Sequence, residues 1–146
     1  MLFVYGTLQD ADILGAVLGR AVDTTRLRPA MAPGYRAVAY PGRVYPALVV
    51  SAPDRAPGLL LEDLSQDDLA MLDAFEGLEY RRHSIAVICG EELHQADAYL
   101  QVAAIPSGAP AWSLADWTSL HKPAVLGEER ATAVALRQRL SSRPPS

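Results

Sequence analysis

The chain opens on a short run of bulky apolar residues. Residues 2–5 read Leu-Phe-Val-Tyr and are followed by Gly6, a pattern that predicts a buried strand ending at a turn. Apolar positions then recur at helical spacing over residues 12–18, and Gly19 follows them, which predicts a short helix with a glycine at its carboxyl end. A further buried strand is predicted at residues 58–61, where glycine precedes three leucines.

The segment between these two strands is interrupted by residues that end regular structure. Proline lacks a backbone donor and glycine favours turns, so we expect loops to dominate residues 26–50. Strands of only four to six residues are predicted there, at 35–40 and 47–50. The interrupting residues are Pro29, Pro33, Gly34, Pro41, Gly42 and Pro46.

Residues 65–75 carry the clearest helix pattern. Ser65 can cap the first turn, and Asp68 stands three residues later, where the acidic partner of a capping box belongs. Leucine and phenylalanine recur every three residues along one face. Gly77 is well placed to end the helix.

The rest of the chain predicts a hairpin and two helices. Residues 82–89 alternate apolar and polar positions, Gly90 begins a turn, and residues 97–102 return as the second strand. A short helix opens at residues 113–116, and a longer amphipathic helix occupies about 124–140.

Together these patterns give about six short strands and three or four helices, with no regular alternation between them. This order favours an α+β domain over a doubly wound parallel sheet. We expect a small, curved, mixed or antiparallel sheet that forms a barrel-like core with helices around it. Residues 1–140 are predicted to be a single domain, and residues 141–146, with two prolines, a disordered tail.

Composition and charge narrow the range of partners. Of 146 residues, 50% are hydrophobic and 21% charged, and the formal net charge is -4, which is typical of a globular domain. Lys122 is the only lysine and no basic stripe exists, so nucleic acid is not an expected partner. No apolar run is long enough for a membrane span and no secretory signal is evident. We therefore expect a cytoplasmic protein that binds a small molecule.

Common catalytic and metal-binding motifs are missing from the sequence. It contains no phosphate-binding glycine loop, no nucleophile elbow and no zincin motif. Cys89 is the only cysteine, which excludes an intrachain disulfide, and we interpret it as a buried structural thiol. His83, His94 and His121 are too scattered to form a local ligand pair. Neither a metal nor a cofactor is predicted.

Three segments instead resemble a known family. Residues 3–8 read Phe-Val-Tyr-Gly-Thr-Leu, residues 45–48 read Tyr-Pro-Ala-Leu, and residues 72–82 read Leu-Asp-Ala-Phe-Glu-Gly-Leu-Glu-Tyr-Arg-Arg. Their order and spacing resemble the gamma-glutamylcyclotransferase-like family over residues 1–102. The carboxyl-terminal third carries no diagnostic motif.

The resemblance implies a reaction in which the α-amine of a γ-glutamyl substrate attacks its own γ-carbonyl. The products are 5-oxoproline and a free amine. Because ring closure is intramolecular, the enzyme must mainly hold the substrate folded, remove one proton and return one. The resemblance assigns this catalytic role to Glu76. Phe75 and Gly77 flank this residue, so we expect partial desolvation to raise its pKa.

The resemblance places substrate binding at Tyr5, Gly6, Thr7 and Leu8. Backbone N–H groups can converge on an anion at a turn that contains glycine, with no basic side chain needed. Leu8 directly follows Thr7, whereas the glutathione-handling branch has an asparagine after the equivalent serine. The shorter turn is similar to that of the gamma-glutamylamine cyclotransferase branch and argues against glutathione as substrate. Tyr99 matches a position where relatives carry an aromatic residue, and is a candidate substrate contact.

Other readings remain open from sequence alone. Asp73 and Glu79 are expected to be structural or solvent-facing, and Tyr45 to serve in packing. The same scaffold could be a non-catalytic domain that binds a small carboxylate or amino-acid derivative, or a hydrolase that releases glutamate. The leaving amine, the pathway and the choice between monomer and homodimer are not determined by the sequence.

Overall fold

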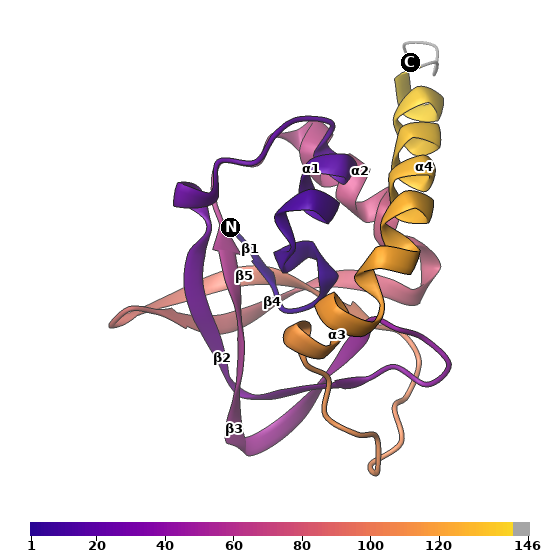
Figure 1. The fold of residues 1–146 in the computed structure, drawn as a ribbon. Helices are drawn as coiled ribbons and strands as arrows, with labels where there is room; N and C mark the ends of the chain where they lie inside the picture. Colours follow the sequence, from indigo (N-terminus) through magenta and orange to yellow (C-terminus); the bar gives the residue numbers. More distant parts are fainter. Residues whose placement is uncertain (142–146) are drawn as a thin grey trace.

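Five strands close into a barrel in the computed structural model, which describes residues 1–141 (Figure 1). The neighbours follow the order β1-β3-β2-β4-β5, and β5 closes the ring against β1. Every pair is antiparallel except β1 with β5. The mixed, closed sheet of an α+β domain is therefore confirmed. The strands are β1 (Leu2–Val4), β2 (Arg28–Ala39), β3 (Pro46–Leu61), β4 (Tyr80–Cys89) and β5 (Glu92–Gln101).

Helices α1, α2 and α4 gather on one side of the barrel (Figure 1). No described helix is long and apolar enough to cross a membrane. The α-helices are α1 (Ala11–Leu18), α2 (Gln66–Glu76), α3 (Leu114–Leu120) and α4 (Lys122–Ser141), and the 3-10 turns are η1 (Thr7–Gln9), η2 (Thr24–Arg26) and η3 (Gly77–Glu79). Helix α4 includes Ser141, the first residue of the predicted tail, and residues 142–146 lie outside the described part of the chain.

The segment predicted to be mostly loop is instead the longest ribbon of the sheet. Strands β2 and β3 have 12 and 16 residues and pair from Arg28 opposite Leu60 to Ala39 opposite Pro46. Proline is tolerated at sheet edges and bulges. The β2–β3 register shifts next to Pro33, and β2 meets β4 only at Met31, so much of β2 has a single neighbour. The prediction of four-to-six-residue strands was therefore wrong.

The strand count and one boundary also differ from the prediction. Five strands, not about six, form the described sheet because the predicted pieces at 47–50 and 58–61 belong to the single strand β3. Strand β5 begins at Glu92, directly after the turn at Gly90, and not at residue 97. The two strands are joined by a turn of only two residues, so the β4–β5 pairing begins at Cys89 opposite Glu92.

The interior of the barrel is filled largely by small side chains. Two aromatic rings, Phe3 and Tyr5, lie among them with their centroids 6.5 Å apart. A barrel of few strands encloses little space, which explains why alanine is frequent inside it. Gly58 allows β3 to approach β1 closely, because a Cβ at that position would overlap the Val4 carbonyl oxygen. The buried alanines of this cluster are Ala30, Ala32, Ala56, Ala96 and Ala98.

Charged side chains tie the helices to one another. Asp10 caps α1, and Lys122 at the start of α4 approaches Asp10 and Asp12 at 2.8 Å each. Arg20, after α1, pairs with Asp68 in α2 through two hydrogen bonds of 2.7 and 2.9 Å. These contacts fix the start of α2 and the start of α4 relative to α1.

Candidate active site

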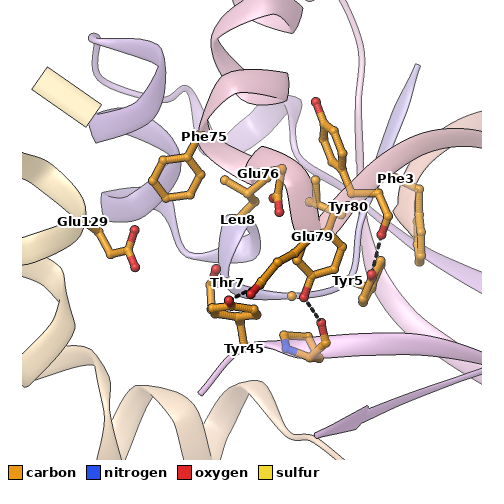
Figure 2. Close-up of a pocket in the computed structure, with 14 residues that line it drawn as sticks. Phe3, Tyr5, Thr7, Leu8, Tyr45, Phe75, Glu76, Glu79, Tyr80 and Glu129 are labelled. Carbon is orange, nitrogen blue, oxygen red and sulfur yellow. Dashed lines mark hydrogen bonds between the residues drawn. The ribbon is translucent and has the colours of Figure 1, made fainter. Parts of the chain in front are cut away.

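A cavity of about 120 Å³ lies where the end of β1, the start of β3, the end of α2 and helix α4 meet (Figure 2). Its volume is below the roughly 300–1,000 Å³ typical of pockets for drug-sized ligands, so it suits a small molecular group. The lining residues are Phe3, Val4, Tyr5, Gly6, Thr7, Leu8, Tyr45, Pro46, Phe75, Glu76, Glu79, Tyr80, Tyr99 and Glu129.

The turn after β1 forms one wall of this cavity. Gly6 precedes the 3-10 turn η1, and a Cβ at that position would come within 2.9 Å of the Pro46 ring. Glycine is therefore required for the close approach of this turn to β3. The N–H groups of Gly6, Thr7 and Leu8 donate no hydrogen bond to any described residue. Their donors remain available to a ligand.

Glu76 is the last residue of α2, and Gly77 ends the helix with φ +68°. In Figure 2 the Glu76 side chain reaches into the pocket, and among described residues its carboxyl group has no hydrogen-bond partner. Glu76 is half-buried and lines the cavity, and the surrounding protein removes most of the hydration of its carboxylate. This desolvation, reinforced by the charges of Glu129 and Glu79, raises the pKa of Glu76 to about 8. The rise expected from sequence is thus present.

Three buried tyrosines form a polar wall around this acid. The Tyr5 hydroxyl donates to the backbone carbonyl of Tyr99, and the Tyr80 hydroxyl donates to that of Pro46 at 2.5 Å. Tyr99 donates to Asp73 at 2.7 Å. Burial raises the pKa of all three phenols, so they stay neutral. Each hydroxyl proton is already committed to a protein acceptor, which leaves Glu76 as the better proton carrier.

The pocket contains a second carboxylate, Glu79, whose negative charge is balanced by Arg43. Arg43 donates to Glu79 through Nη2 at 2.8 Å and through Nε at 3.0 Å, and the Tyr45 hydroxyl donates to its other oxygen. These bonds, with that from Tyr45 foremost, hold the pKa of Glu79 below its ordinary value. Burial raises the pKa of Tyr45 to about 12. Tyr45 therefore does more than pack, and Glu79 lies in the pocket. Both residues belong to the segments that resemble the family, and this was the sequence evidence that could have marked them as pocket residues.

The third carboxylate, Glu129, comes from α4 and was missed from sequence. It is half-buried, and burial followed by the charge of Glu128 raises its pKa. Nothing in the local sequence marks it, because its place at the pocket depends on how α4 packs against α1 and α2. Within residues 1–141, no group of three histidine, cysteine, aspartate or glutamate side chains is arranged to hold a metal ion.

The fold brings all six sequence-predicted site residues to this one cavity. Asp73, in contrast, lies on the exposed face of α2, where Arg82 binds it at 2.7 Å and Tyr99 also donates to it. Asp73 thus has the structural role expected for it. The six residues that meet at the cavity are Tyr5, Gly6, Thr7, Leu8, Glu76 and Tyr99.

The barrel and its flanking helices define a protein of the gamma-glutamyl cyclotransferase-like fold. The structure is similar to one called gamma-glutamyl cyclotransferase, with a TM-score of 0.61 and 14% identity, covering 99% of this chain and 88% of the other. A solution structure of an Arabidopsis thaliana protein gives a TM-score of 0.65 at 27% identity, covering 99% and 93% of the two chains.

Sequence comparison then gives the family. Residues 2–119 match the family model described as gamma-glutamyl cyclotransferase, AIG2-like, and the chain belongs to that family. AIG2-like protein A of Arabidopsis thaliana is 32% identical over 124 residues, which cover 83% of this chain and 73% of the relative. AIG2-like protein D of the same plant is 31% identical, with 82% and 80% covered.

Proposed function

We propose that this protein is a γ-glutamyl cyclotransferase that converts a γ-glutamyl amine or γ-glutamyl peptide to 5-oxoproline and a free amine. The observation that carries the proposal is the Glu76 carboxyl group, which is desolvated and without a hydrogen-bond partner among described residues, in a cavity beside a turn with free N–H groups. Membership of the family supports the same reaction.

The turn after β1 is proposed to bind the α-carboxylate of the substrate. Gly6, Thr7 and Leu8 offer backbone donors at one wall of the cavity. Such donors bind an anion without the mobility of a long basic side chain. Tyr99 contributes its ring to the wall, since its hydroxyl is engaged with Asp73. Held by this end, the glutamyl chain can fold so that its amine reaches its own γ-carbonyl.

Glu76 is proposed to move the proton. Its carboxylate accepts a proton from the substrate's α-amino group, and the nitrogen forms a new bond to the γ-carbonyl carbon. The protonated Glu76 then donates that proton to the departing nitrogen as the original amide C–N bond breaks. One ring bond forms, one amide bond breaks, and Glu76 ends as it began. A pKa of about 8 suits both steps, because a group near neutrality gives and takes protons with comparable ease.

The test is mass-spectrometric detection of 5-oxoproline after incubation with γ-glutamyl amino acids, γ-glutamyl-ε-lysine, γ-glutamyl polyamines and glutathione. We expect the parent protein to form it, and Glu76→Gln to lose at least about 100-fold in rate because an amide cannot carry the proton. Glu91→Gln, in the exposed turn between β4 and β5, removes a carboxylate away from the cavity and serves as the matched control.

The same experiment separates the other readings of the site. Full activity of Glu76→Gln would refute the role of that acid. Release of free glutamate in place of 5-oxoproline would identify a hydrolase, in which water and not the substrate amine is the nucleophile. Calorimetric binding of 5-oxoproline without turnover of any substrate would favour a binding domain.

A further inference from the structure

The pocket holds more carboxyl groups than cationic side chains. The pocket is lined by Glu76, Glu79 and Glu129. Among the described residues, Arg43 is the cation that contacts one of these three carboxyl groups. Arg43 forms its ion pair with Glu79. Glu76 is required by the proposed chemistry, which leaves the carboxyl group of Glu129 without an assigned task.

Glu129 is half-buried at the pocket, yet no described residue forms an ion pair or hydrogen bond with it. Two cations of α4, Lys122 and Arg130, are directed elsewhere. Lys122 pairs with Asp10 and Asp12, and Arg130 lines a different groove, between α1 and α4. A partly desolvated carboxyl group without a partner carries a free-energy cost, and a cationic group of a ligand would reduce that cost.

Glu129 lies on the α4 side of the pocket, where Thr7 and Leu8 are also drawn in Figure 2, and away from Tyr5. In Figure 2, Glu76 and Glu79 lie between Glu129 on one side and Tyr5 on the other. The residue belongs to α4, which starts beyond the family-matched residues 2–119. A substrate cleaved beside Glu76 could pair with Glu129 only through a cationic group that reaches the α4 side of the pocket.

We propose that Glu129 selects substrates whose leaving amine carries a second, positively charged group, such as the distal ammonium of an alkyl diamine. The inference rests on the proposed cyclotransferase function and adds a specificity determinant on α4. The ammonium group would pair with the Glu129 carboxylate while the amide nitrogen is released at Glu76.

Two substrates of equal length test this selection. γ-Glutamyl-diaminobutane ends in an ammonium group, and γ-glutamyl-pentylamine ends in a methyl group at the same position. We expect the parent protein to favour the first by about tenfold or more in kcat/KM, as is usual for a charged hydrogen bond. Glu129→Gln should lose that preference, so that the two kcat/KM values become about equal. The ratio of the two values is the readout, because the Glu129 charge also raises the pKa of Glu76 and its removal affects both substrates alike.

Glu128→Gln is the matched control, because it removes the same charge from the adjacent, exposed position outside the pocket. It should retain the preference. Equal kcat/KM for the two substrates in the parent would overturn the inference and leave the cyclotransferase function standing. A preference that is retained in Glu129→Gln would also overturn it, whatever the change common to both substrates. No 5-oxoproline from either substrate would overturn the proposed function together with the inference.

Discussion

Replacing Glu76 by glutamine should change how the stability of the protein depends on pH. In the folded state the pKa of Glu76 is about 8, against an ordinary value of 4.5. Between these values the unfolded chain releases the proton while the folded protein keeps it. The stabilisation from the protonated carboxyl is therefore complete below about pH 4.5, and it is lost as the pH rises through about 8.

The magnitude follows from the width of this interval. Each pH unit corresponds to about 1.4 kcal/mol, so the interval from 4.5 to about 8 amounts to roughly 5 kcal/mol of unfolding free energy. That is a large share of the ~5–15 kcal/mol by which folded domains are stable. Glutamine has no proton to lose, so Glu76→Gln should not show this decline.

Urea unfolding followed by circular dichroism, repeated at pH values from about 4.5 to about 9, measures the effect. The unfolding free energy of the parent should fall relative to that of Glu76→Gln as the pH rises, with the steepest divergence between the two pKa values. Glu91→Gln controls for the loss of a carboxylate at an exposed site. Parallel curves for the parent and Glu76→Gln would refute the reasoning, because the carboxyl group would then be equally solvated in both states.

Three further predictions concern packing, helix contacts and catalysis. Gly58→Ala should cost about 1–3 kcal/mol in urea unfolding because its Cβ meets the backbone of β1, whereas Gly127→Ala, in open space on α4, should be neutral or stabilising by up to about 1 kcal/mol. Asp68→Ala removes the pair with Arg20 and the acidic half of the α2 capping box, which accepts from the Ser65 N–H. It should lower the unfolding free energy by about 1–3 kcal/mol, and least in acid because the pair with Arg20 lowers the pKa of the carboxyl. The rate of 5-oxoproline formation should rise with pH toward about 8 as Glu76 ionises, and a flat profile would argue against a carboxylate base.

Local sequence patterns predicted the elements whose boundaries depend on neighbouring residues. The capping box of Ser65 and Asp68 begins α2 as expected, and Gly77 ends it. The turn at Gly90 joins β4 and β5, with φ +63°. Each of these signals acts within about four residues, so the tertiary structure had little to add.

The sequence also singled out candidate site residues through a resemblance, but it could not show that they meet. Tyr5 and Glu76 are separated by about seventy positions and become neighbours of one cavity only because β1 lies against β3 and α2 follows β3 directly. The resemblance indicated which residues belong to the site, and the closed barrel brings them together in space.

The failures have one physical cause, which is that long-range contacts override local preference. Prolines between residues 26 and 50 predicted loops, yet pairing with β3 holds β2 extended over 12 residues, and the bulge near Pro33 accommodates the interruption. Glu129 lies at the pocket because α4 is anchored to α1, through Lys122 to Asp10 and Asp12. The sequence by itself determined the α+β class, the start and end of α2 and the candidate acid. Only the tertiary structure decided the length of the β2–β3 ribbon, the desolvation of Glu76 and the third carboxyl group beside it, because each depends on atoms that are distant in sequence.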